Sequence, residues 1–356
     1  MKAWRLERLG GALTFEDIPA PTVRAGTVLV RIEASPLLSY LKKYVEGKLP
    51  FYSPPPGAFT PGTNGVGVIE EVGRDVWHLK PGQRVVFSPH LVAGENVDEP
   101  AQMLIGLTAF GAGSAAIQAD WRDGALAEYA LAPVATLTPL DGLEAIDAAQ
   151  LAVLNRFIVP FGGLLRGRLA AGETLVVNGA TGAYGAAAVL LGLAMGAARI
   201  VAAGRNAAAL DAVARAGGSR LAPVRLTGDA SADAASLRAA AGGGAQIAFD
   251  MVGQAGDANA TLAALNSLRR GGRLVLMGSM TTPLPLSYSD IMRNDWEIIG
   301  QFMYPAGAYR RLIGLMRAGL LDITPIRART FPLAALPAAM EAAAQAGSLE
   351  CVVVRP

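Results

Sequence analysis

The sequence predicts an α/β protein in two parts, the first built from short β-strands and the second from a doubly wound parallel sheet of six strands. Residues 1–140 carry short apolar or alternating runs separated by glycines and prolines, a pattern typical of an all-β unit. From about Leu151 the pattern changes to strands that alternate with helices. A glycine-rich turn joins the first strand and the first helix of this second part.

The composition fits a folded protein with a large core. The chain has 356 residues, enough for two domains, of which 52% are hydrophobic and 17% are charged. The formal net charge is +2 and the sequence holds no block of lysines and arginines, so we expect no nucleic-acid partner. The charged N-terminal residues lack the apolar core of a signal peptide, and we expect a cytoplasmic protein.

One uncharged run, residues 174–198, is long enough to cross a membrane. Five glycines, together with Asn178, Thr181 and Tyr184, divide it into a short strand, a turn and a helix. We therefore expect no membrane partner.

Cysteine and histidine are too scarce for the usual metal sites. Cys351 is the only cysteine, and His78 and His90 are the only histidines. These residues allow neither a disulfide framework nor a cysteine-based zinc site. We expect the protein to bind no metal.

Four runs predict strands in the first part, at residues 27–35, 65–73, 83–89 and 126–133. Residues 49–62 hold five prolines, which predicts an irregular surface segment. Residues 91–124 are ambiguous, and we expect a partly helical lobe or a lid there.

Six runs predict strands in the second part, at residues 174–180, 199–204, 220–226, 245–253, 273–279 and 296–304. Helices are predicted between them at residues 183–196, 206–218, 232–244 and 257–272. The last fifty residues predict one or two helices and a closing strand at 349–356, which we expect to return to the first part.

The turn after the first of these strands has the composition of a dinucleotide-binding turn. Gly179, Gly182 and Gly185 follow an apolar strand and precede a helix, so the backbone can approach a pyrophosphate closely. The N-terminus of the helix then offers free N–H groups and the positive end of its dipole to the anion. The cofactor contacts predicted in this turn are Gly179, Thr181, Gly182, Ala183, Tyr184 and Gly185.

The end of the second strand predicts NADP rather than NAD. An NAD site usually has an acidic residue there, which binds the 2′-hydroxyl of the ribose. Here Gly204 occupies that place and Arg205 and Asn206 follow. Glycine leaves room for a 2′-phosphate and a guanidinium pairs with it. The alternative is that Arg205 is only a solvated residue at the start of a helix.

The chain resembles the medium-chain dehydrogenase/reductase superfamily. The resemblance rests on segments that occur in the family's order, at residues 61–86, 124–133, 175–185, 248–253 and 271–278. It implies a GroES-like β domain at 1–150, a Rossmann NADP-binding domain at 151–305 and a C-terminal return to the substrate domain at 306–356. It also implies a small-molecule substrate and a homodimer.

The resemblance also shows where this chain departs from zinc-containing members. Those enzymes carry Gly-His-Glu at the positions of Gly62, Thr63 and Asn64, with the histidine as a zinc ligand, and a cysteine ligand at the position of Leu38. Their four-cysteine structural site corresponds to residues 91–113, which hold no cysteine. Threonine and leucine cannot replace these ligands, so the chain looks like the zinc-independent branch of quinone and enoyl reductases.

This resemblance implies an NADPH-dependent reductase of an activated C=C bond, in an enone, enal or enoyl thioester, or of a quinone. The developing enolate is then held by hydrogen bonds instead of a metal. Two alternatives remain. One is a metal-free carbonyl or imine reductase, and the other is a non-catalytic NADPH-binding protein.

Three residues are candidates for the chemical step. Tyr52 stands twelve residues before Asn64, as a tyrosine does in the enoyl thioester reductases, whereas Tyr40 aligns with a proton-relaying Ser or Thr of the zinc enzymes. Either is a candidate proton donor, with solvent as the alternative, and both equally suit the lining of a substrate cleft. Asn64 either orients the substrate or nicotinamide or only forms the turn.

The nicotinamide end of the cofactor is expected near the carboxyl ends of later strands. The family's Thr-Ala pair before the Rossmann domain is absent, and Asn155 and Phe157 lie in that neighbourhood. The residues predicted for this end are Asn155, Val252, Gly278, Ser279, Met280, Gln301, Phe302 and Met303.

Overall fold

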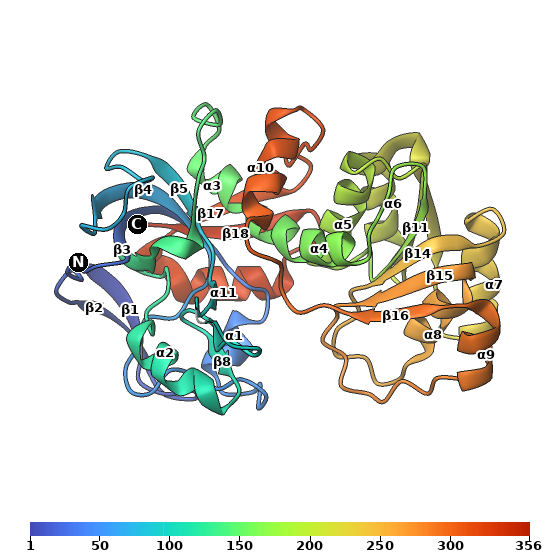
Figure 1. Cartoon of the computed structure of the whole chain (residues 1–356), viewed down its shortest axis with the longest axis horizontal. Helices are drawn as coiled ribbons and strands as arrows, with labels where there is room; N and C mark the ends of the chain where they lie inside the picture. The colour runs from blue at the N-terminus through green and yellow to red at the C-terminus, as the bar shows by residue number, and fades with distance from the viewer. Residues whose placement is uncertain (95) are drawn as a thin grey trace. The chain divides into compact units, whose positions relative to one another are not determined.

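The computed structural model describes residues 1–94 and 96–356 and divides into two compact units. The first, here called the substrate unit, holds Met1–Asn155, Arg327–Ala346 and Cys351–Pro356. The second, here called the nucleotide unit, holds Arg156–Ile326 and Gly347–Glu350. Figure 1 colours the chain by residue number, so the blue and green N-terminal segments and the red C-terminal segments of the substrate unit are seen in different colours.

A seven-stranded sheet forms the centre of the substrate unit. Its strand order is β10-β5-β4-β3-β18-β17, and β9 also pairs with β3. The bounds are β3 (Thr27–Pro36), β4 (Gly65–Val72), β5 (Arg84–Phe87), β9 (Tyr129–Pro133), β10 (Leu137–Pro139), β17 (Arg327–Pro332) and β18 (Glu350–Arg355). The inward faces of these strands supply an apolar core that includes Val30, Ile69, Val85, Phe87 and Leu137. All four strands predicted for residues 1–140 are present.

The N-terminal residues form a separate hairpin in which β1 (Lys2–Leu6) pairs antiparallel with β2 (Leu13–Asp17). The closing strand β18 pairs antiparallel with β3, with Val353 opposite Pro36 and Val354 opposite Ser35. In the two-unit division the return to the substrate unit starts at Arg327 rather than at residue 306. The reason is that α10 (Ala308–Arg317) packs within the nucleotide unit, where the Arg311 guanidinium lies 5.8 Å from the centre of the Phe161 ring.

The ambiguous stretch 91–124 contains a small sheet and a helix. Strands β6 (His90–Val92), β7 (Gln102–Leu104) and β8 (Thr108–Phe110) pair antiparallel, and α2 (Ala115–Asp120) follows. The proline-rich stretch 49–62 contains no named helix or strand among the described residues, in line with the expectation from its five prolines.

A parallel six-stranded sheet forms the nucleotide unit, which confirms the predicted fold class. Its order is β13-β12-β11-β14-β15-β16, and every neighbouring pair is parallel. The bounds are β11 (Thr174–Asn178), β12 (Arg199–Gly204), β13 (Leu221–Arg225), β14 (Ala245–Asp250), β15 (Leu268–Leu276) and β16 (Glu297–Gly300). Figure 1 shows α5 (Ala183–Ala194) and α6 (Ala207–Gly217) close together, while α7 (Ala230–Ala240) and α8 (Asn259–Asn266) cover another part of the sheet.

Two strands of this sheet have bounds other than the expected ones. β15 starts at Leu268, earlier than predicted, because residues that read as the end of a helix continue the strand. β16 ends at Gly300, so Gln301 to Met303 follow the strand instead of lying in it. A helix that the periodicity did not predict, α9 (Tyr288–Asn294), precedes β16 and is capped by the Ser287 side chain.

One helical run, Ala148–Arg166, is long and apolar enough to cross a membrane by length and composition alone. It comprises α3 (Ala148–Ala152) and α4 (Leu154–Arg166). Of its most apolar window, 83% is buried inside the protein, as in the core helix of a folded domain. The run first considered, residues 174–198, forms β11 and α5 instead.

Candidate functional site

The turn between β11 and α5 has the geometry that a pyrophosphate site requires. Gly179 adopts a positive φ of 82°, which favours glycine, and Gly182 is the N-cap of α5. A Cβ atom on Gly185 would lie 2.0 Å from the Gly179 carbonyl oxygen, so only glycine lets the helix approach the strand this closely. The first N–H groups of α5 therefore point at the turn, where an anion binds favourably.

A cavity of about 330 Å³ opens beside this turn within the nucleotide unit. Six of the residues predicted to bind the cofactor line it, and the rest of the lining comes from the end of β11, the loops after β13 and β14, and the helices α7 and α8. The six are Gly179, Thr181, Gly182, Gly204, Arg205 and Val252. The cavity lies at the carboxyl ends of the strands, where open α/β sheets bind their ligands.

The last residue of β12, Gly204, lies where an NAD site usually has an acidic residue, and its surroundings are crowded. A Cβ atom on Gly204 would lie 2.5 Å from Cγ2 of Thr181, so the turn leaves no room for an aspartate there. Arg205 is exposed and lines the cavity. Asn206 has a local task, because its side chain accepts a hydrogen bond of 3.1 Å from the Ala209 N–H and caps α6.

Two carboxylates, those of Asp233 and Asp257, also line this cavity. Asp233 is buried and accepts hydrogen bonds from the Thr227 hydroxyl and from the N–H groups of Thr227 and Gly228. The exposed Asp257 accepts a hydrogen bond from the Asn259 N–H at the start of α8. Both carboxylates thus hold loop backbone in place around the cavity.

Asp250, at the end of β14, ties three segments of the nucleotide unit together. Its carboxylate accepts hydrogen bonds from the Asn178 amide at 3.3 Å, the Val252 N–H at 2.9 Å and the Thr261 hydroxyl at 2.5 Å. Burial raises the pKa of this carboxyl, and the bonds from Thr261, Val252 and Asn178 oppose that rise. The residue fixes the loop that lines the cavity and so has the structural role that its buried strand indicates.

Of the residues predicted for the nicotinamide end, Val252 lines this cavity, whereas those that follow β15 and β16 stand outside its lining, namely Gly278, Ser279, Met280, Gln301, Phe302 and Met303. A Cβ atom on Gly278 would lie 2.1 Å from the Val252 carbonyl oxygen, so these two loops touch through their backbones. Ser279 and Met280 continue the first loop. After β16, the Gln301 amide donates to the Phe302 carbonyl, and Met303 adopts a left-handed φ of 50°.

Ala183 and Tyr184 open α5. The guanidinium of Arg156 lies 5.7 Å from the centre of the Tyr184 ring, within the range of a cation–π contact. Tyr184 is therefore packed against a cation in the same unit, beside the turn that the sequence predicts for the pyrophosphate.

In the substrate unit the two candidate tyrosines are neighbours. The Tyr40 and Tyr52 ring centroids are 5.9 Å apart, and Tyr40 precedes α1 (Leu41–Val45). The Tyr52 ring also meets the edge of the Tyr44 ring, whose hydroxyl donates to the Leu107 carbonyl. Burial raises the pKa of Tyr52, and its hydrogen bond with Tyr40 opposes that rise. Tyr52 therefore stays protonated across the neutral range, as a proton donor must.

We expect Tyr52→Phe to lower kcat by about a hundredfold if its hydroxyl delivers the proton, the lower range for general acids. Tyr40→Phe should lower kcat less, because Tyr40 acts through its hydrogen bond to Tyr52.

The pKa of Tyr52 in the folded protein is raised above its ordinary value of 10.0. Its hydroxyl therefore stays neutral below pH 10 and is lost only as the pH rises through that raised pKa. The kcat–pH profile should therefore show no alkaline loss from Tyr52 below about pH 10. A Tyr52→Phe variant with full kcat would exclude Tyr52 and leave Tyr40 or solvent as the donor.

The residues at and around the two metal-ligand positions of the zinc enzymes, Leu38 and Thr63, are uncharged. Leu38 is buried and apolar. Thr63, Asn64 and Asn155 are also buried, and the Asn155 amide lies 3.4 Å from Asn64 Oδ1, to which it donates a hydrogen bond. Zinc prefers thiolate, imidazole and carboxylate ligands, and no group of three such side chains occurs at metal-binding distance within residues 1–94 and 96–356. This donor set does not fit a zinc ion.

Sequence reasoning missed two features of this buried cluster of Thr63, Asn64 and Asn155. Asn155, which the sequence predicts as a cofactor contact, also lies against Asn64 within the substrate unit, and this contact was not predicted. Thr63 was considered only as a lost ligand, yet its side chain is buried beside the turn. The available signal was a hydroxyl and an amide, Thr63 and Asn64, in the turn that carries a zinc ligand in the zinc enzymes.

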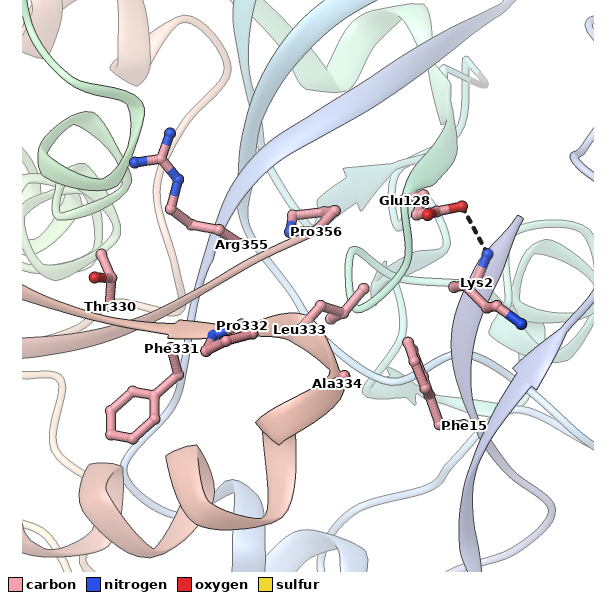
Figure 2. Close-up of a pocket in the computed structure, with 10 residues that line it drawn as sticks. All are labelled: Lys2, Phe15, Glu128, Thr330, Phe331, Pro332, Leu333, Ala334, Arg355 and Pro356. Carbon is pink, nitrogen blue, oxygen red and sulfur yellow. Dashed lines mark hydrogen bonds between the residues drawn. The ribbon is translucent and has the colours of Figure 1, made fainter.

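A different cavity of about 470 Å³ lies in the substrate unit and is shown in Figure 2. Phe15, Phe331 and Leu333 give it an apolar wall, and the Lys2 N–H donates to the Glu128 carboxylate at its rim. None of the predicted site residues lines it. Its position gives no support for a role in the predicted chemistry.

Two protein-family models match this chain, one in each of its two units. Residues 24–142 match the family model described as alcohol dehydrogenase GroES-like domain. Residues 183–318 match the model described as zinc-binding dehydrogenase. The first match lies in the substrate unit and the second in the nucleotide unit.

Two curated relatives cover nearly the whole chain. An alcohol dehydrogenase of Moraxella sp. (strain TAE123) is 30% identical over 340 residues, which are 91% of this chain and 91% of the relative. A sorbitol dehydrogenase of Bacillus subtilis (strain 168) is 27% identical over 96% of this chain and 93% of the relative. Among solved structures, 2R,3R-butanediol dehydrogenase from Bacillus subtilis superposes with a TM-score of 0.82 at 21% identity, covering 100% of this chain and 99% of that one.

Proposed function

Because this chain belongs to the medium-chain dehydrogenase/reductase superfamily and is thus an NAD(P)-dependent oxidoreductase, we propose that it transfers hydride from NADPH without a catalytic zinc ion. The proposed acceptor is an activated C=C bond, in an enone, enal or enoyl thioester, or a quinone. The observation that carries this proposal is the neutral, buried cluster of Thr63, Asn64 and Asn155, in which Thr63 stands at the position of the zinc-ligand histidine.

The chemistry of that cluster favours conjugated acceptors. Reduction of a simple ketone concentrates negative charge on one oxygen, which a Lewis-acidic metal stabilises by several kcal/mol in related chemistry. Hydride addition to a conjugated alkene spreads the charge over an enolate, for which neutral hydrogen-bond donors suffice. Hydroxyl and amide groups are the donors that this chain supplies, and Tyr52 or Tyr40 then delivers the proton to carbon.

A second candidate function is metal-free reduction of a carbonyl group. It is favoured by the names of the relatives, which include alcohol and sorbitol dehydrogenases. In this case the hydride adds to the carbonyl carbon, and a tyrosine protonates the resulting alkoxide. Tyr40 or Tyr52 supplies the hydroxyl in both candidate functions. The two functions therefore differ in the group that accepts the hydride and not in the protein residues involved.

We propose NADPH as the cofactor because Gly204 and Arg205 line the cavity beside the dinucleotide turn. A guanidinium there pairs with a 2′-phosphate, and no side chain fits on Gly204 against Thr181. The 2′-hydroxyl of NADH gains nothing comparable from these two residues.

We further propose a cytoplasmic homodimer formed along the edge of the nucleotide sheet. β16 is the last strand in the sheet order. The segment that precedes β16 in the chain carries exposed apolar side chains that suit an interface, namely Leu286, Tyr288 and Met292. Tyr288 is 83% exposed. Sedimentation of wild type and Tyr288→Glu distinguishes a dimer through this edge from a monomer.

The experiment that tests the proposed function is NADPH consumption with a paired set of acceptors, 2-cyclohexenone, trans-2-hexenal, a benzoquinone and cyclohexanone. Each acceptor is assayed with and without a metal chelator. Chelator-insensitive turnover of the unsaturated compounds is the expected result. Turnover of cyclohexanone alone would defeat the leading proposal and favour the carbonyl reductase.

A further inference from the structure

Two buried polar atoms in the neutral cluster have no hydrogen-bond partner within the described part of the chain. They are the Thr63 hydroxyl oxygen and Oδ1 of Asn155. The exposed fractions of Thr63, Asn64 and Asn155 are 4%, 6% and 2%, so bulk solvent does not satisfy these atoms. A buried polar atom left unpaired costs about 1–3 kcal/mol. Such atoms indicate a place where another molecule completes the hydrogen bonding.

The hydrogen bond between Asn155 and Asn64 fixes what the cluster offers. Asn155 donates its amide N–H to Asn64 Oδ1, so its own carbonyl oxygen faces elsewhere as an acceptor. Thr63 offers a hydroxyl, which donates and accepts. The open positions are therefore one acceptor and one hydroxyl, and the three side chains carry no charge.

This pattern is complementary to a neutral hydroxyl group. A hydroxyl donates one hydrogen, as an acceptor such as Asn155 Oδ1 requires, and accepts one, as the Thr63 hydroxyl can supply, so this one group has both of the properties that the two unpaired atoms need. A bare carbonyl oxygen satisfies Thr63 alone and leaves Asn155 Oδ1 unpaired. A carboxylate places negative charge against the same amide oxygen, which repels it.

We propose that Thr63 and Asn155 bind a hydroxyl group of the substrate, on the carbon next to the one that receives the hydride. This inference rests on the proposed function, because it assumes that Asn64 orients the reacting group. Asn64 hydrogen-bonds to Asn155, so the side chain that would orient the reacting group and one that would bind the hydroxyl belong to the same hydrogen-bond network. The substrate class is a hydroxylated enone or a hydroxyketone.

A site built to pair with a hydroxyl rejects the analogue that lacks it, because both protein atoms then stay unpaired. Hydrogen-bonding sites of this kind discriminate by up to about 10⁴-fold, whereas an apolar pocket discriminates by roughly tenfold to two-hundredfold. The same two atoms also suit a buried water molecule, in which case no such discrimination follows.

The test compares kcat/KM for matched acceptors, 4-hydroxy-2-cyclohexenone against 2-cyclohexenone and 2-hydroxycyclohexanone against cyclohexanone. We expect the hydroxylated member of the reactive pair to be preferred by at least about a hundredfold. Thr63→Val removes the hydroxyl at nearly constant volume and should reduce that ratio to below about tenfold. Asn155→Leu is the second variant with the same expected effect. Thr22→Val makes the first substitution on an exposed threonine and should leave the ratio unchanged.

Binding is measured alongside turnover, as the rise in melting temperature that each of the four compounds produces with NADP⁺ present. A larger rise with the hydroxylated compounds, lost in Thr63→Val, supports the inference even if no acceptor is reduced. Equal kcat/KM values within the reactive pair, in an active enzyme, overturn the inference and leave the proposed function standing. Equal melting-temperature shifts without turnover overturn both and indicate a buried water at the cluster.

Discussion

Gly185→Ala is expected to abolish most of the affinity for the dinucleotide. The added Cβ would lie 2.0 Å from the Gly179 carbonyl oxygen, and backbone atoms rather than a flexible side chain stand in its way. Either the turn opens or α5 moves away from β11, at a cost of about 1–3 kcal/mol or more. Since about 1.4 kcal/mol is tenfold in affinity, we expect the Kd for NADPH to rise roughly tenfold to a hundredfold. Fluorescence titration of NADPH measures it.

The matched control is Gly314→Ala in α10, where the structure describes no atom within 4 Å of the added Cβ. Alanine is the better helix former by about 1 kcal/mol, so this variant should be as stable as the wild type or more stable, with unchanged affinity. Wild-type affinity in Gly185→Ala would mean that NADPH binds elsewhere than at this turn.

Arg205→Ala is expected to weaken NADPH binding and leave NADH binding almost unchanged. A charge-assisted hydrogen bond contributes about 1.5–3 kcal/mol, which corresponds to roughly a tenfold to hundredfold rise in the KM for NADPH. NADH has no 2′-phosphate and so makes no such contact with Arg205, and its KM should change by less than about twofold. Steady-state kinetics with both cofactors, in both proteins, gives the two ratios.

Arg215→Ala is the control, because Arg215 is exposed on α6 and does not line the cavity. It should leave both KM values as they are. Equal losses for NADPH and NADH in Arg205→Ala would contradict the assignment of a 2′-phosphate to this residue and would make Arg205 a solvated helix-start residue.

The sequence was sufficient for the nucleotide unit because its signals are local. An apolar strand, a turn with Gly179, Gly182 and Gly185, and an alanine-rich helix are consecutive in the chain, and the structure forms them within a residue or two of the predicted bounds. The start of β15 was missed because Leu268 to Gly272 continue a helical pattern, and only pairing with β14 shows that they extend the strand.

The candidate site depends on contacts that are distant in sequence. Asn64 and Asn155 are 91 residues apart, and no periodicity relates them. Tyr44 was not considered, yet its ring packs on Tyr52 and its hydroxyl reaches Leu107. The residue types were visible in the sequence, but which of them meet was decided by the folding of the substrate unit.

The measurement that tests the central claim most directly is the zinc content of the active enzyme, determined together with its turnover. Purified protein is analysed for metals by mass spectrometry, before and after dialysis against a chelator, and its kcat with the best acceptor is measured on the same samples. The neutral cluster of Thr63, Asn64 and Asn155 predicts far less than one zinc ion per chain and the same kcat in both samples. One zinc ion per chain that is lost together with activity, and restored together with it, would contradict the account.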